Sequence, residues 1–158
     1  MIIRQIEQND NVSLAELIRT VFEEFELEKE GSVYSDATTD ALYSLFSMPK
    51  SVYWVCVDND IVMGGCGIIA THGLPLDCVE IVKFYVSSQA RGKGIGKALL
   101  QKSIASAREF GYKQLYLESF PKFLTAINMY EKLGFRKIDK ALGNSGHFAC
   151  SVWMVMDL

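Results

Sequence analysis

The chain has 158 residues and a mass of 17.7 kDa, a length that predicts one domain spanning 1–158. Hydrophobic residues make up 49% and charged residues 22%, which excludes a disordered or fibrous protein. Lys and Arg number 16 and Asp and Glu 19, and this net charge of −3 argues against a general nucleic-acid binder. No apolar run reaches the roughly 18 residues of a membrane span, and no signal peptide is evident, so we expect a cytoplasmic protein without a membrane partner.

The four cysteines lie among apolar neighbours and form no CxxC pair. This pattern predicts buried, reduced thiols and no metal site. The cysteines are Cys56, Cys66, Cys78 and Cys150.

The first half of the chain changes from helical to strand-like patterning near Ser51. Upstream, apolar residues recur at helical spacing after Asn11 and Ser13, either of which can cap a helix. Downstream, β-branched and aromatic residues indicate strands, two of which form an antiparallel hairpin. The expected elements are a strand over 1–6, a helix from Asn11 or Ser13 to about Phe25, a shorter helix over 36–46, and strands over 51–57 and 61–70.

The second half alternates strands with helices that end at glycine. Gly111 and Gly134 each follow a run with helical apolar spacing, as is typical of a helix C-terminus. The expected elements are strands over 78–86, 114–118, 135–138 and 147–157, with helices over 94–110 and from Pro121 to Leu133. The order β-α-α-β-β-β-α-β-α-β-β predicts an α/β (α+β) fold in which helices cover a mixed sheet.

A glycine-rich loop follows the strand over 78–86 and opens the next helix. Its sequence is Arg91-Gly92-Lys93-Gly94-Ile95-Gly96-Lys97. Glycines let successive backbone N–H groups face one point, and the N-terminus of a helix carries partial positive charge. Because three basic side chains surround that point, the loop predicts a binding site for a phosphate or pyrophosphate.

Several interpretations compete for this loop. A Walker loop requires Ser or Thr after Lys97, where Ala98 stands. A dinucleotide fingerprint requires glycine in place of Lys97, although Glu118 at the end of the next strand fits that pattern. The pattern Arg/Gln-x-x-Gly-x-Gly/Ala is met in full from Arg91 to Gly96. A glycine turn that merely starts a helix would leave the basic side chains unexplained.

The most specific motifs are VEIVKFYVSSQARGKGIGKALL and AINMYEKLGF. The first resembles the acetyl-CoA pyrophosphate motif of the GCN5-related N-acetyltransferases (GNAT), and the second resembles the helix and strand that follow it in that family. The resemblance covers 78–138 closely and the rest by element order. It implies a mixed, mostly antiparallel, twisted sheet of about seven strands, flanked by about four helices and splayed between its fourth and fifth strands.

The resemblance also implies acetyl-CoA as a co-substrate, without a metal. The pantetheine arm would pair with the backbone of the fourth strand, and the pyrophosphate would meet the glycine-rich loop. One departure is Phe123, which stands where many members carry a cofactor-contacting Asn, so we expect backbone or apolar contact there. The implied cofactor-binding residues are Phe84, Tyr85, Val86, Arg91, Gly92, Lys93, Gly94, Ile95, Gly96 and Lys97.

Amine acetylation requires a base for the amine proton, and Glu80 is the first candidate. Its place in Cys78-Val79-Glu80-Ile81-Val82 predicts burial, which raises the pKa of a carboxyl group toward neutrality. The match of EIV to the histone-acetyltransferase branch of the family implies the same role. The structural alternative is a solvated carboxylate, or one paired with Lys83 or with a loop lysine.

Three further side chains are candidates for moving or holding protons. The resemblance places Tyr130 at the family tyrosine that faces the thioester sulfur, where a phenol can protonate the leaving thiolate; core packing is the alternative. Glu118 ends the fifth strand and is a second base, an amine-orienting group or a plain surface carboxylate. His147 lies in the loop entering the last strand and suits a proton relay, unless it is inert.

The sequence therefore predicts an N-acetyltransferase that moves the acetyl group of acetyl-CoA directly to a primary amine of a small molecule or peptide. A non-catalytic acyl-CoA-binding or sensing module and, more distantly, a dinucleotide-dependent oxidoreductase are the alternatives. No motif encodes the oligomeric state, with a homodimer among the options. An acidic segment either attracts cationic acceptors such as polyamines or is a solvated face. Its residues are Glu23, Glu24, Glu26, Glu28 and Glu30.

Overall fold

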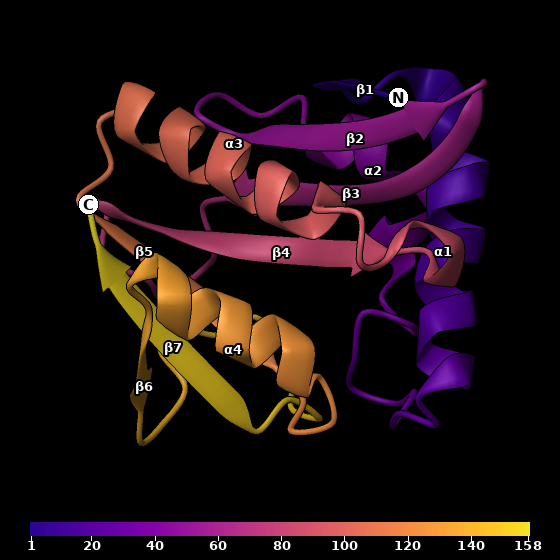
Figure 1. The fold of residues 1–158 in the computed structure, drawn as a ribbon. Helices are drawn as coiled ribbons and strands as arrows, with labels where there is room; N and C mark the ends of the chain where they lie inside the picture. Colours follow the sequence, from indigo (N-terminus) through magenta and orange to yellow (C-terminus); the bar gives the residue numbers. More distant parts are fainter.

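The computed structural model describes residues 1–158 and contains one seven-stranded sheet. Its strand order is β1-β2-β3-β4-β5-β7-β6, and every neighbouring pair is antiparallel except β4 and β5. The mixed, mostly antiparallel sheet is thus confirmed (Figure 1). The strands are β1 (Ile2–Gln5), β2 (Val52–Asp58), β3 (Ile61–Ile69), β4 (Cys78–Val86), β5 (Gln114–Ser119), β6 (Arg136–Ile138) and β7 (Val152–Asp157).

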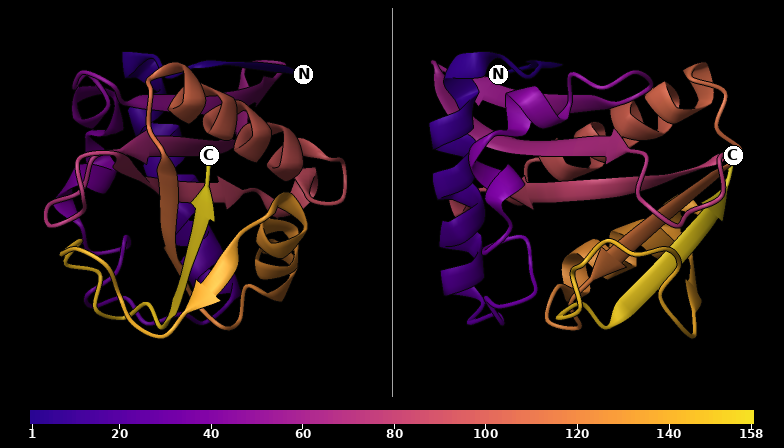
Figure 2. Two further views of the ribbon diagram at one scale, coloured as in Figure 1. Left: turned by 90° about the vertical axis from the view of Figure 1, so that its left-hand side faces the viewer. Right: turned by 180° about the vertical axis from the view of Figure 1, so that it is seen from behind.

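Four α-helices cover the two faces of the sheet, with α1 and α2 on one face and α3 and α4 on the other (Figure 1 and Figure 2). Leu14 and Phe22 of α1 are fully buried under the first face, and Leu99 of α3 under the second. Each face therefore has its own hydrophobic core. No helix has the length and apolar character needed to cross a bilayer. The helices are α1 (Asn11–Glu24), α2 (Leu42–Leu45), α3 (Ile95–Glu109) and α4 (Leu124–Leu133).

A bulge in β4 turns the side chain of Lys83 out of the regular strand pattern. Lys83 has a φ of 52°, and the register of β3 against β4 shifts between Gly65 and Gly67. A Cβ added at Gly67 would come within 2.5 Å of the ring of Tyr53, so glycine is needed for this close approach. The Tyr53 hydroxyl donates a 2.7 Å hydrogen bond to the carbonyl of Lys83 and holds the bulge. The Lys83 ammonium is thereby buried against Thr39, in the 3₁₀ turn over Ala37–Asp40.

β4 and β5 separate partway along their length, which confirms the expected splay. They pair in parallel only from Cys78 with Gln114 to Ile81 with Leu117. Beyond these residues the two strands diverge, and β7 follows β5 away from β4 (Figure 1). The remainder of β4 consequently has no strand beside it on that edge. We call the point of divergence the fork.

The prediction of one helix over 36–46 was wrong. The segment forms a 3₁₀ turn over Ala37–Asp40 followed by the single turn of α2. The Asp36 carboxylate caps the first turn by accepting the N–H of Thr38, and Ala41 then leaves helical geometry with φ −134° and ψ 44°. A side chain that caps so early divides the apolar pattern into two short pieces.

Three expected boundaries also need correction. The first strand covers Ile2–Gln5 rather than 1–6, and the helix expected from Pro121 begins at Leu124, after a turn in which the N–H of Phe123 bonds to the carbonyl of Phe120. The final strand begins at Val152 rather than 147. The backbone before it bonds to other loops instead, as in the 3.0 Å hydrogen bond from Ala149 to the carbonyl of Gly31.

Candidate active site

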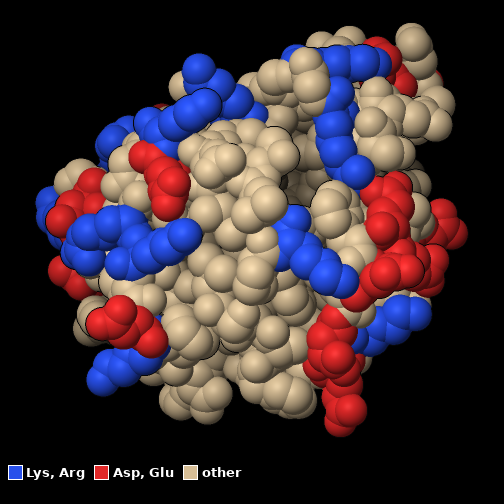
Figure 3. Space-filling model, turned by 60° about the horizontal axis from the view of Figure 1, so that its bottom comes forward, with Lys and Arg blue, Asp and Glu red and all other residues tan.

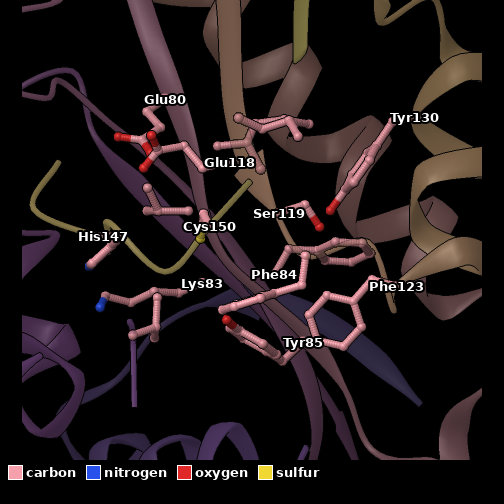
Figure 4. A pocket seen from close by; sticks show the side chains of 15 residues that line it. Glu80, Lys83, Phe84, Tyr85, Glu118, Ser119, Phe123, Tyr130, His147 and Cys150 are labelled. Carbon is pink, nitrogen blue, oxygen red and sulfur yellow. The ribbon is translucent and has the colours of Figure 1, made fainter. Parts of the chain in front are cut away.

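Two cavities meet at the fork. A large cleft of about 600 Å³ is bounded by the end of α1, the start of α3 and α4. A small cavity of about 40 Å³ lies on the side of α1 and α2 (Figure 4). Phe84, Tyr85, Phe123 and Tyr130 line both. A ligand extended along the large cleft can therefore present its end to the small cavity.

The glycine-rich loop lines the large cleft with open backbone. Gly94 is the N-cap of α3 with φ 80°, and Gly92 has φ 76°; glycine adopts this left-handed region without strain. A Cβ at either position would meet no atom within 4 Å, so nothing in the protein fills this space. The first N–H groups of α3, starting at Ile95, lack helical partners and adjoin that space, which suits an anion.

Arg91 joins this loop to the end of α1. Its guanidinium bonds to the Glu24 carboxylate at 2.6 Å and to the carbonyl of Val86 at 3.1 Å. It also lies 5.2 Å from the centre of the Phe25 ring, a cation–π distance. The side chain is therefore already committed to holding one wall of the cleft.

The remaining basic side chains are not equivalent. Lys97 lines the cleft, whereas Lys93 is exposed and lies outside its lining. Lys122, which the sequence analysis overlooked, also lines the cleft and donates to the carbonyls of Phe25 and Glu26, each at 3.0 Å. On the face of the molecule drawn in Figure 3, acidic side chains gather on the side where α1 lies, and basic side chains lie across the middle.

Glu80 lies on β4 at the fork and is 2% exposed. Its carboxyl group accepts a hydrogen bond from the hydroxyl of Thr71, in the loop after β3, and points toward Glu118 on β5 (Figure 4). Burial raises the pKa of Glu80 to about 8; the Thr71 hydrogen bond opposes this shift, and the negative charge of Glu118 adds to it. The carboxyl group is thus buried rather than solvated, and Lys83 is not its hydrogen-bond partner. A base with this pKa is suited to take a proton from an amine.

Replacing Thr71 with Val should raise the pKa of Glu80 further, because the hydrogen bond that favours the ionised carboxylate is lost. The rising limb of kcat/KM against pH should then move to higher pH, with a severalfold loss at pH 7 that disappears near pH 9. Thr71→Ser keeps the hydroxyl and should restore the profile. Steady-state rates across this pH range provide the measurement, and an unshifted profile in Thr71→Val would show that Thr71 does not tune the carboxyl group.

Glu118 anchors the loop between β6 and β7, residues 139–151. Its carboxylate accepts hydrogen bonds from the hydroxyls of Tyr116, at 2.7 Å, and of Ser145. The Tyr116 hydroxyl in turn accepts the N–H of Leu142 at 3.1 Å. Glu118 therefore presents a carboxylate to the small cavity and holds the loop that covers it.

Tyr130 reaches the fork from α4 and is 5% exposed. Its ring packs against those of Phe84 and Phe135, with centroids 6.0 and 5.8 Å away. Its hydroxyl makes no hydrogen bond within the chain and points between the diverging strands toward Ser119 (Figure 4). Burial raises the pKa of Tyr130 above its usual value, so the hydroxyl keeps a proton that it can donate. Core packing and an accessible hydroxyl coexist in this residue.

A second polar cluster lies at the small cavity, around Asp36. Its Oδ2 lies 2.8 Å from Nε2 of His147 and 3.5 Å from Nζ of Lys83. The hydrogen bond from His147, the charge of Lys83 and the bonds from Thr38 hold the pKa of Asp36 well below its usual range, despite partial burial. Burial lowers the pKa of Lys83, and Asp36 limits that shift.

Sequence reasoning missed Thr71, Asp36 and Lys122, and it considered Lys83 only as a partner of Glu80. Lys83 carried a signal, since a lysine inside Val82-Lys83-Phe84-Tyr85 interrupts an apolar strand. The sequence around Thr71 and Asp36 carried no such signal, because their contacts with Glu80 and His147 form only when the chain folds. The partner of Asp36, His147, lies 111 residues away in the chain.

Comparison with known proteins agrees with this geometry. The family profile described as "Acetyltransferase (GNAT) family" matches residues 14–135. An uncharacterized N-acetyltransferase of Escherichia coli (strain K12), YjgM, is 39% identical over 158 residues, covering 99% of this chain and 95% of that protein. The chain belongs to the GNAT acetyltransferase family, as its two motif segments predicted.

Solved structures share the fold. An acetyltransferase of the GNAT family from Staphylococcus aureus Mu50 has a TM-score of 0.84 at 22% identity, covering 99% of this chain and 98% of that chain. A GNAT superfamily phosphinothricin acetyltransferase from Sinorhizobium meliloti, in complex with AcCoA, has a TM-score of 0.79 at 26% identity. The match covers 99% of this chain and 88% of that chain. The predicted seven-stranded sheet with four helices is thereby confirmed as the fold of this family.

Proposed function

We propose that this chain transfers the acetyl group of acetyl-CoA directly to a primary amine of a small molecule or peptide. One observation carries the proposal: the two cavities meet at a fork that holds a buried carboxyl group of raised pKa and a tyrosine whose unpaired hydroxyl faces the cavities. A module that only binds acyl-CoA would have no use for a base and an acid at that point. Nothing in the comparisons favours that alternative.

The residues of the large cleft fit acetyl-CoA. The open backbone at Gly92 and Gly94, at the start of α3, suits the pyrophosphate, and Lys97 adds a positive charge. The edge of β4 from Phe84 to Val86 has no strand beside it, so its backbone is available to the amides of the pantetheine arm. Phe123 contributes an apolar ring to the wall, as expected for the residue in place of the usual Asn.

Bound acetyl-CoA supplies an activated acyl carbon at the fork. Ionised Glu80 accepts the proton that the amine loses as the C–N bond forms. Tyr130 donates its proton to the thiolate sulfur as the C–S bond breaks. Cys150 also lines the small cavity, but burial raises the pKa of its thiol to about 12, which disfavours an acetyl-cysteine step and supports direct transfer. Glu118 orients the amine or acts as a second base.

Release of free thiol from acetyl-CoA in the presence of a mixed amine panel tests the proposal. We expect release that depends on both the protein and an amine, with an N-acetylated product detectable by mass spectrometry. Tight binding of acetyl-CoA without amine-dependent release would instead identify a non-catalytic binding module.

Replacing Tyr130 with Phe should slow the chemical step by about tenfold to a thousandfold, the range typical of losing one acid or hydrogen bond at a reacting centre. The defect should be largest at low pH, where the thiolate most needs a proton. Because the ring contacts with Phe84 and Phe135 remain, the melting temperature should change little. A single-turnover assay and a thermal melt on the same protein provide the measurement; full speed with an altered melting temperature would leave Tyr130 as a packing residue.

We further infer that 1–158 works as one catalytic domain in the cytoplasm, without a metal. Both hydrophobic cores share one sheet, which supports a single folding unit. The four cysteines are free and buried, which supports a reducing compartment.

A further inference from the structure

The small cavity carries groups of both charge types on different sides. Glu80 and Glu118 come from the two strands at the fork, and Lys83 and His147 lie together on another side, toward α1 and α2 (Figure 4). A cavity for a simple amine needs only the carboxyl groups. The buried ammonium of Lys83 therefore requires its own explanation.

Lys83 has spare hydrogen-bonding capacity. Its side chain is 2% exposed, and its ammonium donates to Thr39 at 3.2 Å and pairs with Asp36 at 3.5 Å, which leaves one of three N–H groups without a partner in the chain. Asp36 is itself shared, since the same Oδ2 lies 2.8 Å from His147 and Oδ1 accepts two bonds from Thr38. One carboxylate thus serves both a lysine and a histidine, which leaves the third N–H of Lys83 free for an acceptor atom of a ligand.

The backbone holds this lysine in place at a cost. A buried ammonium is unfavourable unless it is well paired, and the φ of 52° at Lys83 lies where a residue with a side chain is strained. Tyr53 maintains that conformation through its 2.7 Å hydrogen bond to the carbonyl of Lys83. Strain of this kind, kept beside a cavity, points to a role in binding rather than in packing.

The size of the small cavity limits the acceptor. A volume of about 40 Å³ holds about three water molecules, which is room for a compact polar group at the fork and not for a bulky or branched one. The loop over 139–151 covers this space and is attached to Glu118 through Ser145, to Asp36 through His147 and to the carbonyl of His72 through Asn144.

We propose that the acceptor is a small zwitterion, an α-amino acid or a close analogue, whose carboxylate binds the Lys83 ammonium while its amine lies at Glu80 and Glu118. This inference rests on the proposed acetyltransferase function. A polyamine would place a second ammonium near Lys83 and be repelled. The side chain of an internal lysine in a peptide has no carboxylate one carbon from its amine.

The test compares acceptors that differ only at the carboxylate. Amine-dependent thiol release is measured with the common free amino acids, their amides, the matching decarboxylated amines and a lysine peptide with blocked ends. In the wild-type protein the best acceptor should be a free amino acid, with kcat/KM at least about tenfold above that of its amide. Lys83→Met should lower this ratio by about tenfold to a hundredfold, the value of a hydrogen bond to a charged group.

Two variants make the comparison specific. Lys132→Met, at an exposed position of α4, removes an equal charge and should leave the ratio of amino acid to amide unchanged. If Lys83→Met does not fold, Lys83→Gln, which keeps a hydrogen-bond donor but removes the charge, should still lower the ratio. An equal preference for amides, or a preference for the blocked peptide, would overturn the zwitterion and leave the acetyltransferase intact. Absence of thiol release with every acceptor would overturn both.

Discussion

Replacing Glu80 with Gln is expected to lower kcat at neutral pH by about a hundredfold to ten-thousandfold, the range that a general base contributes. Gln keeps the size of the side chain and can accept the Thr71 hydrogen bond, but it cannot take the amine proton. Acetyl-CoA affinity should be nearly unchanged, because Glu80 does not line the large cleft. The loss should grow from pH 6 to about pH 8, as Glu80 ionises in the wild type, and shrink toward pH 10, where more of the acceptor is already free amine. Steady-state rates from pH 6 to 10, with calorimetry for the cofactor, provide the measurement.

The same substitution should also change stability in a pH-dependent way. Burial raises the pKa of Glu80 from an ordinary 4.5 to about 8, so between these values the unfolded chain binds fewer protons than the folded one. The free energy of unfolding of the wild type therefore falls across this window as pH rises. Gln carries no such cost, and the melting temperature of Glu80→Gln relative to wild type should increase from pH 5 to pH 8.

Glu109→Gln is the matched control, because Glu109 is exposed at the end of α3, away from both cavities. It should keep wild-type rates and show no rise in relative stability. If Glu80→Gln is as fast as wild type at every pH, the base lies elsewhere, and Glu118→Gln then distinguishes the second carboxylate from a water chain.

Replacing Gly94 with Asp should weaken acetyl-CoA binding by about a hundredfold or more, because a carboxylate would stand where the pyrophosphate belongs. A Cβ at Gly94 meets no atom of the protein within 4 Å, so the fold should survive. Its φ of 80° costs strain, but Asp tolerates this region better than most residues. Calorimetric titration with acetyl-CoA and a circular dichroism spectrum of the same sample provide the measurement.

Gly111→Asp controls for backbone strain and charge together. Gly111 has φ 85° and an equally open environment, but it follows the opposite end of α3. This variant should lose similar stability and keep cofactor affinity. Unchanged affinity in a folded Gly94→Asp protein would place the pyrophosphate elsewhere and reject the loop as its site.

Local patterns in the sequence were sufficient for most of the fold and for the cofactor side. The β-branched and aromatic residues from Ser51 to Val57, and Gly111 after the helix that precedes it, each report a backbone preference that neighbouring residues can satisfy. The same holds for the loop from Arg91 to Lys97, where glycine spacing and a helix start together create an anion site. Prediction failed where a side chain competed with the backbone, as when Asp36 capped a turn inside the helix expected over 36–46.

The acceptor side was decided by tertiary structure. Glu80 was visible in the sequence as a carboxyl group in an apolar strand, but its pKa depends on Thr71 and Glu118, which reach it only when β3, β4 and β5 assemble. The sequence by itself determined the order of elements and the phosphate loop, because both depend on contacts within a few residues. Its two motif segments also identified the family. The cluster of Asp36, Lys83 and His147 depends on a strand bulge and on contacts across 111 residues, whose energies no local pattern records.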